Sequence, residues 1–163
     1  MTDAAIVPGA GAHVGELNIA HPRFALDHPR MADFMNNLDT VNALAERTDG
    51  FVWRLTGDGN NATDLSVPGE PNAIANLSVW ESPQALEHFM RKTIHARFYH
   101  RKSEWFMTAE RRDFVMWPVA PGHRPTLEDA LARLDHLRLH GTSDFAFGWD
   151  GADQMRAWMH ESV

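Results

Sequence analysis

The segment 95–106, HARFYHRKSEWF, holds the side chains of this sequence best suited to acid–base chemistry. His95 and Tyr99 are four residues apart, so a helix would place them on one stripe. Histidine has the one side chain whose usual pKa lies near neutrality, so beside a phenol it is suited to proton transfer. We therefore predict His95 and Tyr99 as a catalytic pair. The alternative is a structural histidine that hydrogen-bonds to a neighbouring loop.

The same segment carries a second stripe and a group of positive charges. Arg101 and Trp105 lie four residues apart, and Arg97 and Lys102 add charge nearby. Guanidinium groups bind carboxylates and phosphates, and an indole offers a flat apolar surface. We predict that Arg101 and Trp105 contact the substrate. The alternative is an ordinary solvated basic face.

Motifs for other chemistries are missing from the sequence. His136 and His140 have the spacing of a shared metal site, but no HExxH-type companion supplies a third ligand. The sequence also contains no phosphate-binding loop, no dinucleotide-binding GxGxxG and no GxSxG of a serine hydrolase. We therefore predict no metal site and no nucleotide site.

The stretch 73–80, AIANLSVW, is predicted to be a strand with two different faces. Asn76, Ser78 and Trp80 alternate with aliphatic residues, and successive side chains of a strand point to opposite faces. In the strand predicted at 14–20, Glu16 and Asn18 alternate in the same way with Leu17 and Ile19. We predict that helices cover the aliphatic face. The opposite, open face would then bear the substrate-binding residues Asn18, Trp53, Asn76, Ser78, Trp80 and Trp117, with Met116 as the alternative to Trp117.

The hydrophobic pattern of the remaining chain predicts an α+β fold. It places strands at 14–20, 51–55, 73–80 and 114–119, and helices near 29–48, from 82, at 93–106 and at 122–141. Phe51, Trp53 and Leu55 are expected to share one face of their strand. This order matches the ferredoxin-like arrangement, a four-stranded antiparallel sheet with its crossover helices on one face.

An open sheet face that carries several tryptophans would be a large apolar patch, which soluble monomers rarely expose. We therefore predict a homodimer in which two sheets stack as a dimeric α/β-barrel. Buried amides need partners, so a ligand pocket inside the barrel would explain the polar residues. The alternative is that Asn18 and Asn76 hydrogen-bond to each other or to water.

Composition limits the class of protein. The 163 residues favour one domain, and a net charge of −7 argues against a general nucleic-acid binder. There are no cysteines, no apolar run of membrane-spanning length, and Asp3 stands where a signal peptide would be positive. We expect a cytoplasmic protein without a membrane partner. It would have a flexible arm at 1–12, the main domain at 13–141, and a tail at 142–163 that packs on its own or a partner subunit.

Several segments together resemble one known family. In order and spacing, ELNIA, GFVWRL, NLSVWES, HARFYHRKSEWF, the run VMWPVAPGHRPTLEDALARLDHLRLHG and the terminal FAF are similar to the domain of unknown function 3291 family, over about residues 14–147. That family is placed in the dimeric α/β-barrel superfamily. The resemblance implies a ferredoxin-like fold, dimers formed through the sheets, and sites in the barrel interior. Members of the superfamily include cofactor-free monooxygenases, polyketide cyclases, isomerases and haem enzymes.

Three functions follow from these observations. The first is an enzyme of secondary metabolism that binds an apolar or aromatic small molecule and uses cofactor-free acid–base chemistry for cyclisation, isomerisation or dehydration. The second is a haem-dependent enzyme of the same fold, with His95 as the axial ligand. The third is a non-catalytic protein that binds a small ligand.

Overall fold

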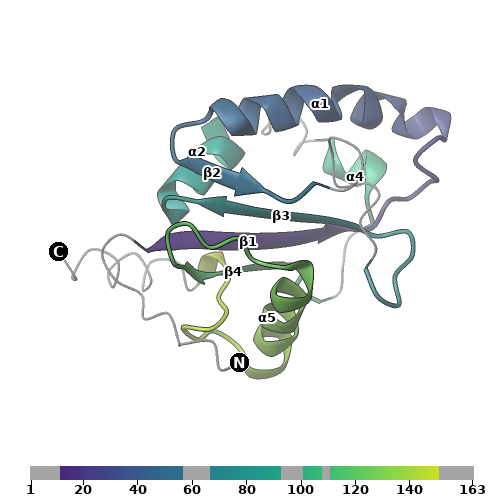
Figure 1. The fold of residues 1–163 in the computed structure, drawn as a ribbon. Helices are drawn as coiled ribbons and strands as arrows, with labels where there is room; N and C mark the ends of the chain where they lie inside the picture. Colours follow the sequence, from purple (N-terminus) through teal and green to yellow (C-terminus); the bar gives the residue numbers. More distant parts are fainter. Residues whose placement is uncertain (1–11, 57–66, 93–100, 108–110, 151–163) are drawn as a thin grey trace.

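A computed structural model describes residues 12–56, 67–92, 101–107 and 111–150 of the chain. Its centre is one antiparallel sheet in the order β2-β3-β1-β4, which confirms the ferredoxin-like arrangement (Figure 1). The strands are β1 (His13–Ala20), β2 (Phe51–Arg54), β3 (Ile74–Trp80) and β4 (Phe114–Val119). The helices are α1 (Ala32–Arg47), preceded by a 3-10 turn at Pro29–Met31, and α2 (Pro83–Lys92), α4 (Lys102–Trp105) and α5 (Leu127–His140).

The crossover helices α1 and α2 cover the sheet face that was expected to be open. Ala45 of α1 and Leu86 and Phe89 of α2 pack in one buried cluster with Val14 and Trp80 of the sheet. The prediction that these helices cover the aliphatic face of β1 and β3 was therefore wrong. The reason is that α1 and α2 pack against apolar side chains at the two ends of β1 and β3. These side chains lie on the same face as the polar residues in the middle of the strands.

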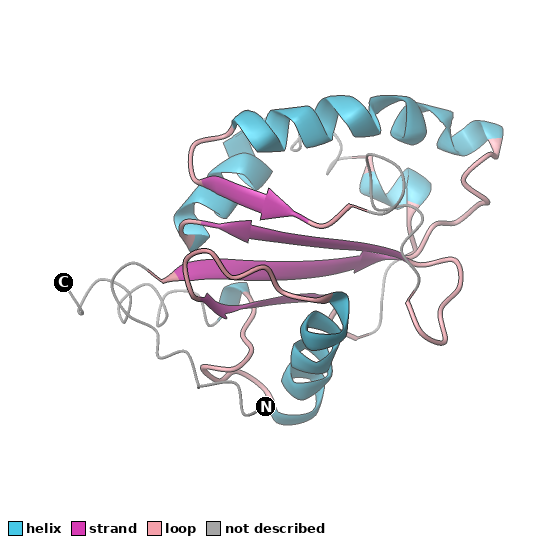
Figure 2. Cartoon of the chain, in the orientation of Figure 1, coloured by secondary structure: helices cyan, strands magenta, loops and turns pink. Residues whose placement is uncertain are grey.

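Helix α5 packs on the aliphatic face instead (Figure 2). Its residues Ala130, Leu134 and Leu137 form one core with Leu17 of β1 and Leu77 of β3, and all five are buried. Thr126 caps the helix by accepting a hydrogen bond from the backbone N–H of Asp129. Within the described residues both faces of the sheet are thus covered by the chain itself. The bare surface that motivated the predicted dimer is absent there.

Strand β2 contains an irregularity that separates its aromatic side chains. Phe51 lies opposite Trp80 in the register, whereas Trp53 lies opposite Val79, with a shift between them. Neighbouring strands place paired residues on the same face, so Phe51 and Trp53 point to opposite faces. The prediction that they share a face was wrong because a regular alternation does not anticipate a β-bulge.

The described part of the tail packs on its own chain. The backbone of Phe147 exchanges two hydrogen bonds with Met116 of β4, at 2.7 and 2.9 Å. Phe147 and Ala146 are fully buried. Residues 1–11 and 151–163, which contain nearly all of the predicted arm and the end of the tail, lie outside the described residues. No helix in the described ranges is long and apolar enough to cross a membrane.

Gly50 gives a direct test of the junction between α1 and β2. Its φ is +90°, and a Cβ added there would overlap the Cβ of Ala85 in α2. Gly50→Ala is therefore expected to lower the free energy of unfolding by about 1–2 kcal/mol, measured by urea denaturation. Gly69→Ala is the matched control, because Gly69 has a φ of +77° but no neighbour within 4 Å. Equal losses in both variants would show that the contact with Ala85 is unimportant.

Candidate functional site

Four polar side chains lie side by side in the middle of the face under α1 and α2, and we call them the polar row. They are Glu16 and Asn18 of β1 and Asn76 and Ser78 of β3. Glu16 pairs with Ser78 in the strand register, and Asn18 pairs with Asn76. Period-two alternation places all four on one face, as the sequence predicted for three of them as site residues.

Hydrogen bonds in the polar row converge on the carboxyl group of Glu16. The Ser78 hydroxyl donates to Oε1 at 2.7 Å, and Asn18 Nδ2 donates to Oε2 at 3.2 Å. Farther out, Trp80 Nε1 donates to Ser78 Oγ at 2.9 Å, and Asn76 Nδ2 donates to Asn18 Oδ1 at 3.1 Å. A carboxylate has about four acceptor positions, so the two bonds to Glu16 leave others free.

Glu16 is the buried acid of this face. Its side chain is 5% exposed, and burial raises its pKa to about 7, against the smaller lowering effects of Ser78 and Asn18. Burial acts in this direction because a low-dielectric surrounding disfavours the charged form. A carboxyl group with this pKa exchanges a proton near neutral pH, which suits a general acid or base.

An aromatic cluster, here called the Trp80 cluster, closes one end of the polar row. Trp80 is 1% exposed and stacks on Phe89, with ring centroids 5.4 Å apart, and Phe51 meets it edge-on at 5.3 Å. Val14 and Met116 complete the cluster on the sheet. The end of the polar row next to Ser78 is therefore lined by apolar side chains and aromatic rings.

The Trp105 cluster closes the other end. Trp105, Phe106 and Met31 are buried with Ile74 of β3, and Phe34 of α1 packs against them. The polar row thus lies between two apolar clusters on one face, an arrangement that suits a ligand with a polar group and apolar ends.

Helix α1 keeps part of its apolar side exposed. Ala45 is its one buried residue, whereas Phe34, Met35, Leu38 and Val41 are half-buried.

Other predicted substrate-binding residues lie elsewhere. Trp53 and Trp117 point to the α5 face, where Trp117 is buried in the aliphatic core and Trp53 packs against it. Their assignment to the same face as Asn76 was wrong. Met116 was the alternative to Trp117, and it is the residue of β4 that lies opposite Glu16. The outcome follows from the register, which the hydrophobic pattern of β2 and β4 alone left open.

Arg101 forms ion pairs with acids of its own chain. Its guanidinium contacts Asp33 of α1 at 3.1 Å and Glu104 at 2.7 Å, and lies over the Trp105 ring at 4.6 Å from the centroid. These carboxylates raise the pKa of Arg101. Both of them would compete with a substrate anion, so the contacts favour the solvated-face alternative over a substrate role.

The predicted catalytic pair, His95 and Tyr99, lies outside the described residues. Their acid–base role stays a prediction, as does the haem ligand role of His95. Among the residues that the structure describes, no group of three or more His, Asp or Glu side chains is arranged to hold a metal ion.

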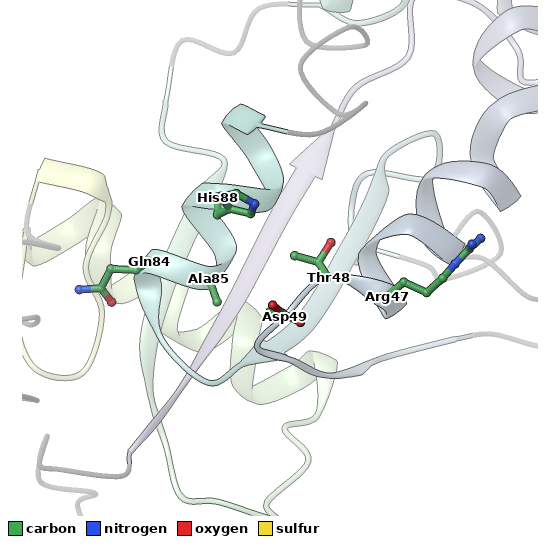
Figure 3. Close-up of a pocket in the computed structure, with 6 residues that line it drawn as sticks. All are labelled: Arg47, Thr48, Asp49, Gln84, Ala85 and His88. Carbon is green, nitrogen blue, oxygen red and sulfur yellow. The ribbon is translucent and has the colours of Figure 1, made fainter.

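An open groove lies on the surface between the end of α1 and α2 (Figure 3). Its lining comes from the last turn of α1 and the residues after it, and from the first turns of α2. The lining residues are Arg47, Thr48, Asp49, Gln84, Ala85 and His88. None of them belongs to the polar row, and the groove contains no side chain that the sequence predicted for the site.

Sequence reasoning missed Glu16 as a functional residue. It treated Glu16 as a polar neighbour of Asn18 on a half-buried strand. The available signal was an acid in the middle of a short alternating segment, VGELNIA, that the fold places in the central strand β1. Central strands are covered on both faces more often than edge strands, so an acid there merits attention.

Comparisons with known proteins identify a family and a set of similar folds. A family model described as Domain of unknown function (DUF3291) matches residues 13–162. No curated relative matches the chain.

Three solved structures illustrate the similarity of fold. SnoaB, a cofactor-independent oxygenase from Streptomyces nogalater, has 16% identity and a TM-score of 0.47, over 71% of this chain and 97% of that one. A conserved protein from Methanosarcina mazei Go1 has 11% identity and a TM-score of 0.49, over 67% and 94%. A putative antibiotic biosynthesis monooxygenase from Chloroflexus aurantiacus J-10-fl has 14% identity and a TM-score of 0.41, over 69% and 97%.

Proposed function

The chain belongs to the DUF3291 family, and from its own polar row we propose that it is an enzyme acting by acid–base chemistry on an apolar or aromatic small molecule. The observation that supports this most is Glu16, a buried carboxyl group with a pKa of about 7 between two apolar clusters. A structural acid in such a position would normally be paired with a cation. The groups that act on Glu16 are neutral donors, Ser78 and Asn18.

The proposed reaction class is cyclisation, isomerisation or dehydration without a cofactor. Each of these reactions removes a proton at one position of the substrate and delivers one at another. Glu16 would take the first proton, because its ionised form is held by two hydrogen-bond donors and retains free acceptor positions. The Trp80 and Trp105 clusters would bind the apolar parts of the substrate.

His95 and Tyr99 remain our proposed partners for delivering the second proton. This part of the proposal rests on their residue types and their four-residue spacing.

Native mass spectrometry of freshly purified protein tests whether the site retains a small molecule. We expect a non-covalently bound aromatic or apolar compound. Asn76→Leu should weaken its binding by about 5- to 150-fold, which corresponds to about 1–3 kcal/mol for a lost polar contact. Trp53→Phe is the control and should leave binding unchanged, because Trp53 lies on the α5 face.

Four results would contradict the proposal. The first is equal weakening in both variants, and the second is an unchanged affinity in Asn76→Leu. The third is an absorption band of bound haem in the purified protein, which would support the haem-dependent alternative instead. The fourth is a retained ligand that is never turned over, which would support the non-catalytic alternative.

A further inference from the structure

Asn18 and Asn76 connect the buried carboxyl group of Glu16 to the outer part of the polar row. Asn18 Nδ2 donates to Glu16 Oε2 at 3.2 Å, and Asn76 Nδ2 donates to Asn18 Oδ1 at 3.1 Å. Glu16 is buried, whereas both asparagines are half-buried. Both amides therefore donate inward, which leaves the carbonyl oxygen of Asn76 and the second hydrogen of its amide nitrogen for a ligand.

A proton on Glu16 needs an acceptor, and the present arrangement offers none on the Asn18 side. An ionised carboxylate only accepts hydrogen bonds, whereas a carboxylic acid must also donate one. A proton on Oε2 in the direction of Asn18 would face an amide hydrogen, and a proton at a free position of the carboxyl group would be a buried donor with no acceptor in the polar row. Both placements are unfavourable unless Asn18 turns.

A hydrogen bond donated by protonated Glu16 to Ser78 is less favourable. Ser78 Oγ already accepts from Trp80 Nε1 at 2.9 Å, and its own hydrogen is donated to Glu16 Oε1 at 2.7 Å. If Glu16 donated to Ser78, the hydroxyl hydrogen would have to leave its present acceptor. A buried donor that loses its acceptor is unfavourable.

Rotation of the Asn18 and Asn76 amide groups lets protonated Glu16 donate without the loss of a hydrogen bond in the polar row. A half-turn of the Asn18 amide exchanges Oδ1 and Nδ2, which have nearly the same size, so packing is kept. Asn18 Oδ1 then accepts from Glu16, and Asn18 Nδ2 donates toward Asn76. A matching half-turn of Asn76 provides its Oδ1 as acceptor and turns its N–H groups outward.

We propose that Asn18 and Asn76 form a two-amide relay, through which the proton on Glu16 sets whether Asn76 offers a ligand its carbonyl oxygen. The carbonyl oxygen is offered, beside one N–H, while Glu16 is ionised. Both N–H groups and no carbonyl oxygen are offered once Glu16 is protonated.

The relay deepens the proposed function by naming a substrate class, and this step rests on that function. The class is an apolar molecule with an enolisable carbonyl group. When Glu16 removes the proton from the carbon next to the carbonyl, the C–H electron pair stays on the substrate and its charge moves to oxygen. The proton is then on Glu16, and Asn76 offers an N–H to the enolate oxygen. A second group protonates another carbon and is itself reprotonated at the expense of Glu16, which regenerates the ionised carboxylate and the inward-donating amides.

This timing would favour the enolate over the bound ketone. Asn76 presents its carbonyl oxygen and one N–H before proton transfer, and both of its N–H groups to the enolate after it. An interaction that forms only as charge develops accelerates the chemical step, whereas one that is equal throughout does not.

Charged side chains occur on the elements around the polar row. Arg54 of β2, in register with Ser78, pairs with Glu46 of α1 at 2.8 Å. Strand β4 presents Phe114, Met116 and Pro118 on this face and no titratable group. The remaining described titratable or charged side chains of α1 and α2 are Asp33, Asp39, Arg47, Glu87, His88 and Arg91. The groups that act on Glu16 are Ser78 and Asn18, together with burial.

Side-chain NMR of the unliganded protein tests the relay directly. The amide signals of Asn18 and Asn76 and the carboxyl carbon of Glu16 would be followed from pH 4 to pH 10. We expect all three to shift with one midpoint near pH 7. In Glu16→Gln the neutral amide donates permanently to Asn18, so the Asn76 signals should stay at their low-pH positions throughout.

Asn18→Ala separates the relay from a simple field effect. Glu16 should still titrate in this variant, but the Asn76 signals should no longer follow it. The relay is overturned if Asn76 still follows Glu16 in Asn18→Ala, if Asn76 is unaffected in the wild type, or if Glu16 keeps one protonation state over the whole range. Because no substrate is present, these results are independent of the ligand and turnover tests of the proposed function.

Discussion

Glu16→Gln is expected to turn substrate over about 10²–10⁴-fold more slowly than the wild type, the loss typical of a positioned acid–base group. Glutamine keeps the size of the side chain and one acceptor for Ser78, but it cannot take up a proton. The measurement is kcat per folded molecule, using the compound identified by mass spectrometry. The fold should be retained, because the substitution removes a buried charge rather than a packed apolar group.

Glu128→Gln is the matched control for this variant. Glu128 is an exposed acid in the first turn of α5, on the opposite side of the sheet, so its replacement removes the same charge far from the polar row. Turnover should stay at the wild-type value. If Glu16→Gln also turns over normally, the base is another group, and the same measurement on His95→Gln and Tyr99→Phe would identify it.

The free energy of unfolding of the wild type is expected to fall between pH 5 and pH 8 by about 2–3 kcal/mol more than that of Glu16→Gln. The pKa of Glu16 is about 7 in the folded protein and close to its usual value of 4.5 in the unfolded chain. Between these two values the folded state binds more protons than the unfolded state, so a rising pH favours unfolding. The penalty is absent below pH 4.5 and complete above pH 7.

Urea denaturation of both proteins at several pH values measures this difference. Other titrating groups contribute equally to both, so subtracting the two curves isolates Glu16. The Glu128→Gln protein should follow the wild-type curve, because its side chain is exposed. A wild-type protein that gains stability relative to Glu16→Gln as the pH rises would mean that Glu16 is stabilised as an anion.

The candidate site was only partly predictable from the sequence. Period-two alternation correctly grouped Asn18, Asn76 and Ser78 on one face, because the register preserves alternation in regular strands. Trp53 was misplaced because a β-bulge interrupts the alternation of β2. The role of Glu16 was missed because the raised pKa depends on burial, which residues distant in the sequence provide.

The sequence by itself determined the order of strands and helices, the ferredoxin-like sheet and the polar residues of β1 and β3. These features depend on local hydrophobic periodicity and on turn and capping residues, such as Thr126 before α5. Tertiary structure alone decided that α1 and α2 cover the polar face while α5 occupies the aliphatic one. Both faces of the central strands offer apolar partners, so periodicity cannot assign each helix to a face. That choice is made by the packing of whole elements, and it is also what buries Glu16.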